Sequence, residues 1–477
     1  MKHYGSFYID GNWVEAPSAS PFVLIDPANE QPFASIGMGT ATDVDHAVAA
    51  ARRAFPAFSE TSREDRLVML ERIVEEFEAR EDQVLAAVSA EMGAPRSMKA
   101  HTRTGIDAFK QTIATLCDYD FETSLGNNIV RREAIGVCGL ITAWNWPVQL
   151  ICTKLSAAFA AGCTVVWKPS EFTPLSALAL AEVMHAAGVP AGVFNLVNGD
   201  GPTVGSAICR HADVDMVSFT GSTRAGVLVA EAAAATVKRV SQELGGKSAN
   251  IILPDADLAA AARWNAARAF SNTGQSCHSP TRILVQRQQL EPLVQLLRQE
   301  SAKVRVGAPQ DAATTMGPVV NKAQFERIQK YIQIGLDEGA RLVCGGVGRP
   351  EGLDSGYFIQ PTIFADVTPA MTIAREEIFG PVVAVLAYET EDEAVAIAND
   401  TPYGLGGYVF STDPRKAHAV GARMRAGRIF YNGAPSNNVA PMGGYKQSGN
   451  GREMGVFGLE EYLEVKAMIG FDPLVPA

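Results

Sequence analysis

The sequence has 477 residues, more than the roughly 250 to 300 at which a single hydrophobic core stops growing, so it predicts at least two domains. Hydrophobic residues make up 47% and charged residues 19%, a balance that excludes an intrinsically disordered chain. With 41 basic and 52 acidic residues the net charge is −11, so the basic surface of a nucleic-acid-binding protein is not expected.

The N-terminal segment MKHYGSFYIDGNWV has no apolar signal-peptide core, and no stretch reaches the ~18 consecutive apolar residues of a membrane span. The seven cysteines are scattered and lack Cys-x-x-Cys spacing, which favours reduced thiols over disulfides or a zinc site. We therefore expect a cytoplasmic protein with no metal, no membrane contact and no nucleic acid, whose partner is a small molecule.

Residues 7–14 place Asp10-Gly11 between aromatic and β-branched residues, which predicts a hairpin with a two-residue turn. Residues 62–80 begin with Ser62 and carry a carboxylate at Asp65, the spacing of a capping box. Apolar side chains then recur on one helical face. The sequence therefore predicts a short antiparallel ribbon followed by a surface helix.

The middle third alternates short β-rich runs with Ala/Leu-rich helical stretches, the pattern of βαβ units in a parallel sheet. The predicted strands are residues 138–144, 164–168, 193–198 and 216–220. Ligands bind outside the carboxyl ends of such strands, so the polar residues that end each run are candidates. These are Asn145 and the segments 168–171, 199–205 and 220–226. A second α/β cycle runs from about residue 249 to about residue 435, with a boundary near Gly245-Gly246.

Cys277 lies in the segment FSNTGQSCHSPTR, among small and polar residues. A lone cysteine is usually a packing residue, but these neighbours predict a partly open turn, the setting in which a thiolate nucleophile forms. Glu243 ends a strand-like run before Gly245-Gly246, and one βα unit separates it from Cys277. An isolated Glu-Gly-Gly is more often a solvated turn; a cleft shared with Cys277 makes the carboxylate a candidate general base.

Asn145 stands between two tryptophans in TAWNWP, where its amide is either an ordinary turn group or a donor to an oxyanion. Two glycine segments, 199–205 and 219–226, open predicted helices and offer backbone N–H groups to a phosphate. The first departs by one residue from the usual dinucleotide fingerprint, so a glycine-rich connecting loop is an equal alternative.

Four motifs together resemble the aldehyde dehydrogenase superfamily, and the match extends from about residue 7 to about residue 466. They are ELGGKS at 243–248, GQSC at 274–277, EEIFGP at 376–381 and GGYKQSGNGRE at 443–453. The resemblance implies NAD-dependent oxidation of an aldehyde to a carboxylic acid, with NADP as a weaker alternative cofactor.

The resemblance also implies the role of individual residues. Cys277 becomes the nucleophile, Glu243 the general base, Asn145 the oxyanion donor and Lys154 a proton relay near the thiol. The implied cofactor contacts are Ile141, Trp144, Lys168, Ser170, Glu171, Gly201, Phe219, Thr220, Gly221, Ser222, Leu244, Gln324, Glu377 and Phe379. Glu171 is expected to favour NAD, because its carboxylate would repel the 2′-phosphate of NADP.

The family architecture implies three parts and a homodimer or homotetramer. A Rossmann-like coenzyme domain is expected from residues 1–115 and 135–246, and an α/β catalytic domain from 247–446. A small β element, 116–134 with 447–477, is expected to bridge subunits.

Two rival functions remain at the level of the sequence. A CoA-acylating relative typically lacks the base at Glu243, and a catalytically silent relative is expected to lose Cys277 or Glu243. The sequence departs from the family at Met442, where Phe is usual, and His278 occupies a variable position beside the nucleophile. The expected aldehyde tunnel contains no Arg or Lys, which disfavours anionic semialdehydes. Its members are Trp146, Leu150, Thr153, Ser276, His278, Asn437 and Asn438.

Overall fold

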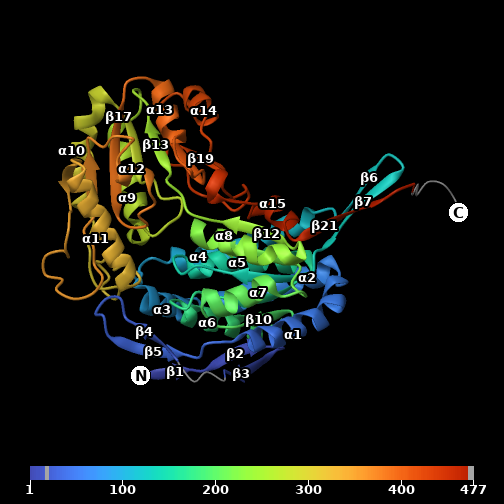
Figure 1. The fold of residues 1–477 in the computed structure, drawn as a ribbon. Helices are drawn as coiled ribbons and strands as arrows, with labels where there is room; N and C mark the ends of the chain where they lie inside the picture. Colours follow the sequence, from blue (N-terminus) through green and yellow to red (C-terminus); the bar gives the residue numbers. More distant parts are fainter. Residues whose placement is uncertain (17–20, 471–477) are drawn as a thin grey trace.

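The computed structural model describes residues 1–16 and 21–470, whose strands form four sheets with helices packed on the two larger ones (Figure 1). The α/β class predicted from the sequence is confirmed. The last seven residues of the expected bridging element, 471–477, lie outside the described part of the chain.

The first large sheet has the strand order β20-β12-β11-β8-β9-β10-β2-β3, and its five consecutive strands from β12 to β10 run parallel. Their bounds are β8 Val137–Ile141, β9 Thr164–Lys168, β10 Phe194–Leu196, β11 Met216–Thr220 and β12 Arg239–Glu243. The predicted runs 164–168 and 216–220 match β9 and β11, whereas 138–144 and 193–198 are longer than the observed strands. Those two strands end at Ile141 and Leu196, before the predicted ends at residues 144 and 198.

Both faces of this sheet are covered, because successive side chains of a strand point to opposite faces. Val165 and Trp167 of β9 face the core formed with α2, α4, α5 and α6, whereas Val166 faces the core formed with α1 and α7. The helices are α1 Ala41–Ser59, α2 Arg63–Ala79, α3 Glu81–Met92, α4 Ala100–Asp118, α5 Pro147–Ala161, α6 Pro174–Ala186, α7 Ser206–Arg210 and α8 Thr223–Ala233.

The strand order of the sheet reverses at β8. β9 and β10 follow it on one side, and β11 and β12 follow on the other. In open α/β sheets the ligand crevice lies outside the carboxyl ends of the strands at such a switch point. The fold therefore predicts a ligand near Ile141 and Thr220, the last residues of β8 and β11.

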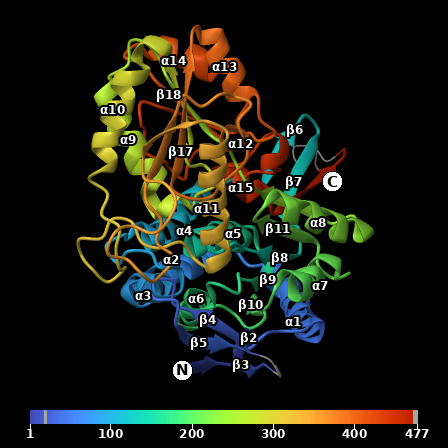
Figure 2. The same cartoon turned by 60° about the vertical axis from the view of Figure 1, so that its left-hand side comes forward.

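The second large sheet has the order β15-β16-β17-β14-β13-β18-β19 and is parallel except for the β15–β16 pair. Its strands are β13 Ala249–Ile252, β14 Arg282–Gln286, β15 Arg341–Cys344, β16 Thr362–Ala365, β17 Val382–Tyr388, β18 Gly406–Phe410 and β19 Arg428–Tyr431. The helices are α9 Leu258–Phe270, α10 Leu290–Ser301, α11 Lys322–Asp337, α12 Thr372–Arg375, α13 Glu391–Asn399 and α14 Pro414–Gly421. They cover the two faces of this sheet (Figure 2).

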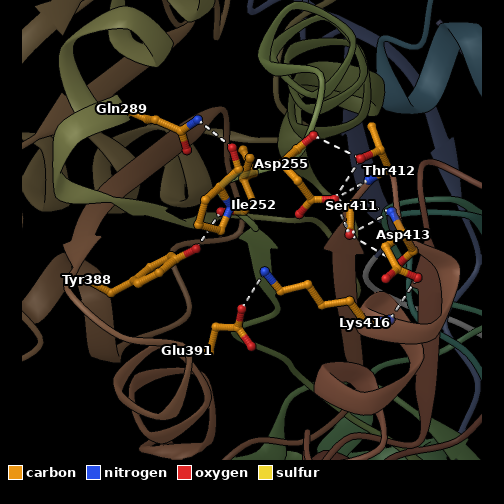
Figure 3. A network of polar contacts seen from close by, with 10 residues as sticks. Ile252, Asp255, Gln289, Tyr388, Glu391, Ser411, Thr412, Asp413 and Lys416 are labelled. Atoms are coloured by element: carbon orange, nitrogen blue, oxygen red, sulfur yellow. Dashed lines mark hydrogen bonds and ion pairs between the residues drawn. The ribbon is translucent and has the colours of Figure 1, made fainter.

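Polar side chains at the carboxyl ends of β13 and β18 join the loops of this second sheet (Figure 3). Asp255, three residues after β13, accepts hydrogen bonds through Oδ2 from the hydroxyls of Ser411 and Thr412, both at 2.7 Å, and from the Thr412 backbone N–H at 2.8 Å. The Tyr388 hydroxyl donates to the carbonyl of Ile252 at 2.8 Å. At the carboxyl ends of β13 and β18, these polar residues therefore connect one loop to another.

The N-terminal part forms the predicted ribbon and an additional small sheet. β2 and β3 pair antiparallel, and Asp10 and Gly11 between them have left-handed φ angles of 53° and 76°, as the two-residue turn requires. Ser62 caps α2 with Asp65 in a reciprocal capping box, as predicted. The strands are β1 Lys2–Tyr4, β2 Ser6–Ile9, β3 Asn12–Glu15, β4 Phe22–Ile25 and β5 Pro32–Ile36, of which β1, β5 and β4 form the small sheet.

The remaining sheet, in the order β21-β7-β6, extends from the body of the molecule (Figure 1). It pairs β7 (Asn128–Ala134) with both β6 (Glu122–Leu125) and β21 (Leu463–Met468), so it joins the two stretches that the sequence assigned to the bridging element. Before β21, the chain passes through β20 (Gly449–Asn450) and α15 (Gly455–Glu460).

No helix of the described residues combines the length and apolar character needed to cross a membrane. Within residues 1–16 and 21–470, no group of three or more His, Cys, Asp or Glu side chains is arranged to hold a metal ion.

Candidate active site

The loop that carries Cys277 runs from the end of α9 to the start of β14 and has an unusual backbone. Asn272, Thr273 and Gly274 adopt left-handed φ angles of 52°, 56° and 71°. A Cβ at Gly274 would lie 2.3 Å from the backbone carbonyl of Gly380, so only glycine fits there. Consecutive left-handed residues of this kind are costly and occur mainly where the surrounding structure holds a functional loop.

Hydrogen bonds tie this loop to the segment that contains Asn145. The Asn145 amide donates to the carbonyl of Gln275 at 3.1 Å, and Asn272 donates to the carbonyl of Asn145 at 2.8 Å. The indole N–H of Trp146 donates to Ser276 Oγ at 2.8 Å. Two residues predicted for the site, Asn145 and Cys277, are therefore brought together. Among the described residues, the Asn145 amide group donates this one hydrogen bond, so its second N–H remains available.

Cys277 as a residue is half-buried, whereas Cys138, Cys152, Cys163 and Cys209 are buried. Burial, together with the nearby carboxylates of Glu243 and Glu377, raises the pKa of Cys277 to about 12, while the backbone N–H groups of His278 and Cys277 itself lower it. The local environment must therefore supply further stabilisation before a reactive thiolate forms.

Glu243 ends β12, as predicted, and its carboxylate is buried. Neither carboxylate oxygen has a hydrogen-bond partner among the described residues. Burial and the neighbouring carboxylate of Glu453 raise the pKa of Glu243 well above its ordinary value, and Lys154 opposes this shift. A buried, unpaired carboxylate next to a thiol is the arrangement of a general base.

Lys154 lies on α5 and is completely buried. Its ammonium forms an ion pair with Glu453 and donates to Ser218 Oγ at 2.9 Å. Glu453 comes near Glu243 because β20 pairs with β12, with Gly449 opposite Glu243. The structure thus connects Glu243, Glu453 and Lys154 in one buried cluster.

The roles of Glu453 and Ser218 were missed at the level of the sequence. Glu453 is the last residue of the GGYKQSGNGRE motif, so the motif contained the available signal. Ser218 lies inside the buried strand β11, where no local signal distinguishes it from a core residue.

Most of the predicted cofactor contacts follow the carboxyl ends of the parallel strands. Ile141 ends β8, Lys168 ends β9, and Phe219 and Thr220 end β11. The other members of this group follow in the loops: Trp144 after β8, Ser170 and Glu171 after β9, Gly201 after β10, Gly221 and Ser222 after β11, and Leu244 after β12.

The residues present fit a dinucleotide at this edge. The hydroxyl of Thr220 is buried without a hydrogen-bond partner among the described residues. A Cβ at Gly201 would meet only open space, whereas one at Gly221 would lie 2.4 Å from the Phe219 ring. Lys168 donates to the carbonyl of Gly199 at 2.7 Å, and its ammonium lies 3.7 Å from Glu171.

Gln324, Glu377 and Phe379 approach the same edge from the second part of the chain. Glu377 accepts a hydrogen bond from the backbone N–H of Gly246 at 2.9 Å, and Gln324 donates to the carbonyl of Phe379 at 2.8 Å. The ring of Phe379 meets that of Trp144 edge to face, with centroids 5.5 Å apart. These contacts bring the predicted residues of the second half to the carboxyl ends of the first sheet.

A pocket of about 460 Å³ opens beside His278. Trp146, His278, Asn437 and Asn438 line it, as expected, and Met442 also lies on its wall. The other expected tunnel residues, Leu150, Thr153 and Ser276, are not among the lining residues.

The expectation of a tunnel without cationic side chains is wrong. Lys110, Arg268 and Arg428 line the pocket, because α4, α9 and β19 converge there from distant parts of the sequence. Arg428 is engaged with the loop that follows β19, since its guanidinium donates to the carbonyls of Asn437 at 2.6 Å and Ala440 at 2.7 Å. With cationic side chains on its wall, this pocket does not disfavour anionic semialdehydes.

The sequence matches the model of the aldehyde dehydrogenase family over residues 13–468. It is 51% identical over 475 residues to a 3-succinoylsemialdehyde-pyridine dehydrogenase of a Pseudomonas species, an alignment that covers 99% of this chain and 100% of the relative.

Solved structures show the same likeness. A mutant of aldehyde dehydrogenase C from Pseudomonas syringae, in complex with NAD⁺ and octanal, superimposes with a TM-score of 0.97 at 51% identity, covering 99% of this chain and 98% of that one. An aldehyde dehydrogenase of Mycobacterium tuberculosis in complex with NAD⁺ superimposes with a TM-score of 0.95 at 40% identity, covering 98% of both chains.

Proposed function

The chain belongs to the aldehyde dehydrogenase family, whose members oxidise aldehydes with NAD⁺, and we propose which of its residues carry out that reaction. Cys277 is the nucleophile, Asn145 the oxyanion donor, Glu243 the general base, and Lys154 with Glu453 the proton path. The observation that carries the proposal is the buried carboxylate of Glu243, unpartnered among the described residues and close enough to Cys277 to raise the pKa of its thiol.

In the first step the Cys277 thiolate attacks the aldehyde carbon, and the carbonyl oxygen becomes an oxyanion. The free N–H of the Asn145 amide and the backbone N–H of Cys277 stabilise that charge. Such a donor typically contributes about 3 to 4 kcal/mol to transition-state stability. NAD⁺ would supply the hydride acceptor when bound, and loss of the hydride from the carbon attached to Cys277 leaves a thioester on this residue.

In the second step Glu243 removes a proton from the water that hydrolyses the thioester. A buried carboxylate with a raised pKa is a stronger base than an exposed one. Glu453 and Lys154 lie next to it, so a proton taken up by Glu243 has a buried route away from the site. The acid is then released, and the thiol is regenerated.

The residues proposed to hold NAD⁺ are those at the carboxyl edge of the first sheet. Backbone N–H groups at the start of α8, preceded by Gly221 and Ser222, would hold the phosphates, and Glu171 would accept hydrogen bonds from the ribose hydroxyls. Glu377 and Phe379 approach from the second sheet, on the nicotinamide side. A CoA-acylating reaction is disfavoured, since Glu243 supplies the base for hydrolysis, and a silent relative would not keep both Cys277 and Glu243.

The pocket favours an aldehyde larger than a two- or three-carbon compound. Its volume of about 460 Å³ falls in the range of sites for drug-sized ligands. The relatives compared above act on a pyridine-bearing semialdehyde or bind octanal. We therefore place the substrate among medium-chain or aryl-bearing aldehydes, and a panel with acetaldehyde, octanal and a semialdehyde, followed by NADH formation, ranks the candidates by kcat/KM.

We propose in addition that the protein is a cytoplasmic homo-oligomer. The seven cysteines are free thiols, which supports a reducing compartment. The β21-β7-β6 sheet extends from the body and exposes apolar side chains, which supports pairing with a second copy as a homodimer or homotetramer.

The nucleophile assignment is tested with Cys277→Ala. We expect turnover to vanish while NAD⁺ binding, measured by calorimetry, remains close to that of the wild type. Cys117→Ser, which changes an exposed thiol, serves as the matched control and should keep full activity. Retention of more than a few per cent of kcat by Cys277→Ala would refute the assignment.

A further inference from the structure

His278 directly follows Cys277, and the mechanism above assigns no role to it. Its imidazole lies between two groups. Nη2 of Arg268, on α9, contacts Nε2, and Cys277 Sγ lies 3.8 Å from Nδ1. Because Tyr408 donates to the carbonyl of His278 at 2.6 Å, the backbone of this residue is also held in place.

The contact with Arg268 determines where the proton of the imidazole resides. A guanidinium is always protonated and only donates hydrogen bonds. Nε2 of His278 must therefore be the acceptor, so the ring is neutral and carries its proton on Nδ1. That N–H is the group that faces the sulfur of Cys277.

We propose that His278 is a catalytic residue that donates a hydrogen bond from Nδ1–H to the Cys277 thiolate, and that Arg268 is the positioning residue that fixes this tautomer. The proposal rests on Cys277 being the nucleophile. The separation of 3.8 Å describes the resting site, and such contacts typically shorten when the charged form develops.

The charges around His278 and Cys277 explain why the imidazole that donates to the thiolate is neutral. Burial and then the charges of Arg268 and Arg428 hold the pKa of His278 well below its ordinary value, so an imidazolium does not form near neutral pH. The carboxylates of Glu243 and Glu377 disfavour the thiolate, since they raise the pKa of Cys277. The donors that oppose them are Nδ1–H of His278 and the backbone N–H groups of residues 277 and 278.

The test measures the rate at which iodoacetamide alkylates Cys277 as a function of pH, with intact mass as the readout. It uses the full-length protein in a Cys117→Ser, Cys344→Ser background, because Cys117 is exposed and Cys344 is half-buried like Cys277. Neither aldehyde turnover nor NAD⁺ is needed for this measurement.

Two substitutions of similar shape separate hydrogen bonding from packing. His278→Leu removes the donor, so the midpoint of the alkylation profile should rise by about one pH unit, and the rate at neutral pH should fall about tenfold. His278→Asn places an amide N–H near the position of Nδ1 and should remain close to the wild type. If His278→Leu leaves the profile unchanged, or if His278→Asn is as impaired as His278→Leu, the proposal is wrong.

Arg268→Met provides an independent test that leaves His278 in place. Without the guanidinium at Nε2, His278 is free to take up a second proton, and its imidazolium would stabilise the thiolate more strongly at lower pH. We expect a second, acidic inflection in the alkylation profile, absent from the wild type. A single unchanged inflection would overturn the role of Arg268.

These outcomes are separable from failure of the proposed function. If Cys277→Ala keeps its turnover, the nucleophile assignment fails, whatever His278 does. If Cys277 is essential but His278→Leu and Arg268→Met behave as the wild type, only the present inference fails.

Discussion

At the scale of single residues, burial makes the Glu243 carboxylate a stronger base by raising its pKa. A carboxylate excluded from water and without hydrogen bonds within the described residues is destabilised as an anion, and it regains stability by binding a proton. The same side chain in a solvated turn would be a much weaker base. Its place at the end of β12, opposite Gly449, produces this environment.

Glu243→Gln should separate the two halves of the reaction. In the proposed mechanism, acylation of Cys277 does not need the base, whereas hydrolysis does. We expect a rapid burst of NADH followed by slow turnover, with an acyl adduct visible in the intact mass. Full steady-state turnover, or faster product formation on adding CoA with release of acyl-CoA, would contradict the hydrolytic role.

The pH dependence of hydrolysis provides a second test at the same residue. Glu243 must be ionised to act, so the rate falls as the pH drops through its raised pKa. Glu453→Gln removes a carboxylate that raises the pKa of Glu243 and leaves the positive charge of Lys154 in place. The pH at which the hydrolysis rate falls to half of its maximum should therefore decrease. The rate of single-turnover thioester hydrolysis is measured as a function of pH. Glu351→Gln, in an exposed loop, is the control. A shift to higher pH would contradict the arrangement.

Glu171 is predicted to set the preference for NAD over NADP. Two like charges ~4 Å apart at an effective dielectric of ~20 repel by about 4 kcal/mol, and solvent reduces this to about 1.4 to 2.8 kcal/mol, or roughly ten- to hundredfold in kcat/KM. Lys168, 3.7 Å from Glu171, further limits the penalty, so some NADP activity should persist. Glu171→Ser should gain relative NADP activity, and Glu351→Ser should not. Equal kcat/KM values for both cofactors in the wild type would refute the prediction.

At the scale of elements, Asp255 connects the loops that follow β13 and β18 (Figure 3). Although burial raises the pKa of Asp255, hydrogen bonds from Ser411 and Thr412 outweigh this effect and hold it well below its ordinary value. A carboxylate whose folded-state pKa is depressed stabilises the fold above its unfolded pKa of about 3.9, and this contribution is lost as the pH falls further.

Asp255→Asn should therefore destabilise the second part of the molecule. Hydrogen bonds to a charged group contribute about 1.5 to 3 kcal/mol, and partial exposure of Asp255 reduces the expected loss to about 1 kcal/mol. Thermal unfolding at pH 7 should show a lower Tm, and the difference from the wild type should shrink below pH ~4. Asp354→Asn, in an exposed loop, should have no effect. If the Tm of Asp255→Asn is lower by the same amount at all pH values, the charge of Asp255 does not contribute to stability and the prediction is wrong.

At the scale of the whole molecule, the β21-β7-β6 sheet is the clearest candidate for contact between subunits. Leu125 and Val465 on its two outer strands are each 66% exposed, which is unfavourable in an isolated chain. Val465→Asp should lower the mass measured by light scattering, whereas Glu464→Gln beside it should not. A monomeric wild type, or a Val465→Asp variant with unchanged mass, would contradict the prediction.

The division into domains also stays a prediction at this scale. β20 pairs with β12, so the chain returns to the first sheet after completing the second. The segment from about residue 447 therefore contacts the part assigned to coenzyme binding before it reaches the protruding sheet. Limited proteolysis should cut at the connection near Gly245-Gly246 only after unfolding, because that segment is buried.

The sequence by itself determined features that depend on neighbours along the chain. The alternation of buried runs with helical stretches predicted the α/β class, and the polar residues at strand ends predicted where Lys168, Thr220 and Glu243 lie. Both follow from the two-residue period of strands and from the exposed turns that end them. The residues around Cys277 and the four motifs then identified the reaction class.

Only the tertiary structure decided which distant side chains meet. Glu453 reaches Glu243 through the pairing of β20 with β12, across more than two hundred residues, and Lys110, on α4, lines the pocket beside His278. The contact of Arg268 with His278 depends on how α9 packs beside the nucleophile loop. No local period encodes such contacts, because they arise from the packing of whole elements. The cationic pocket wall and the contact between Arg268 and His278 therefore became visible only in the folded chain.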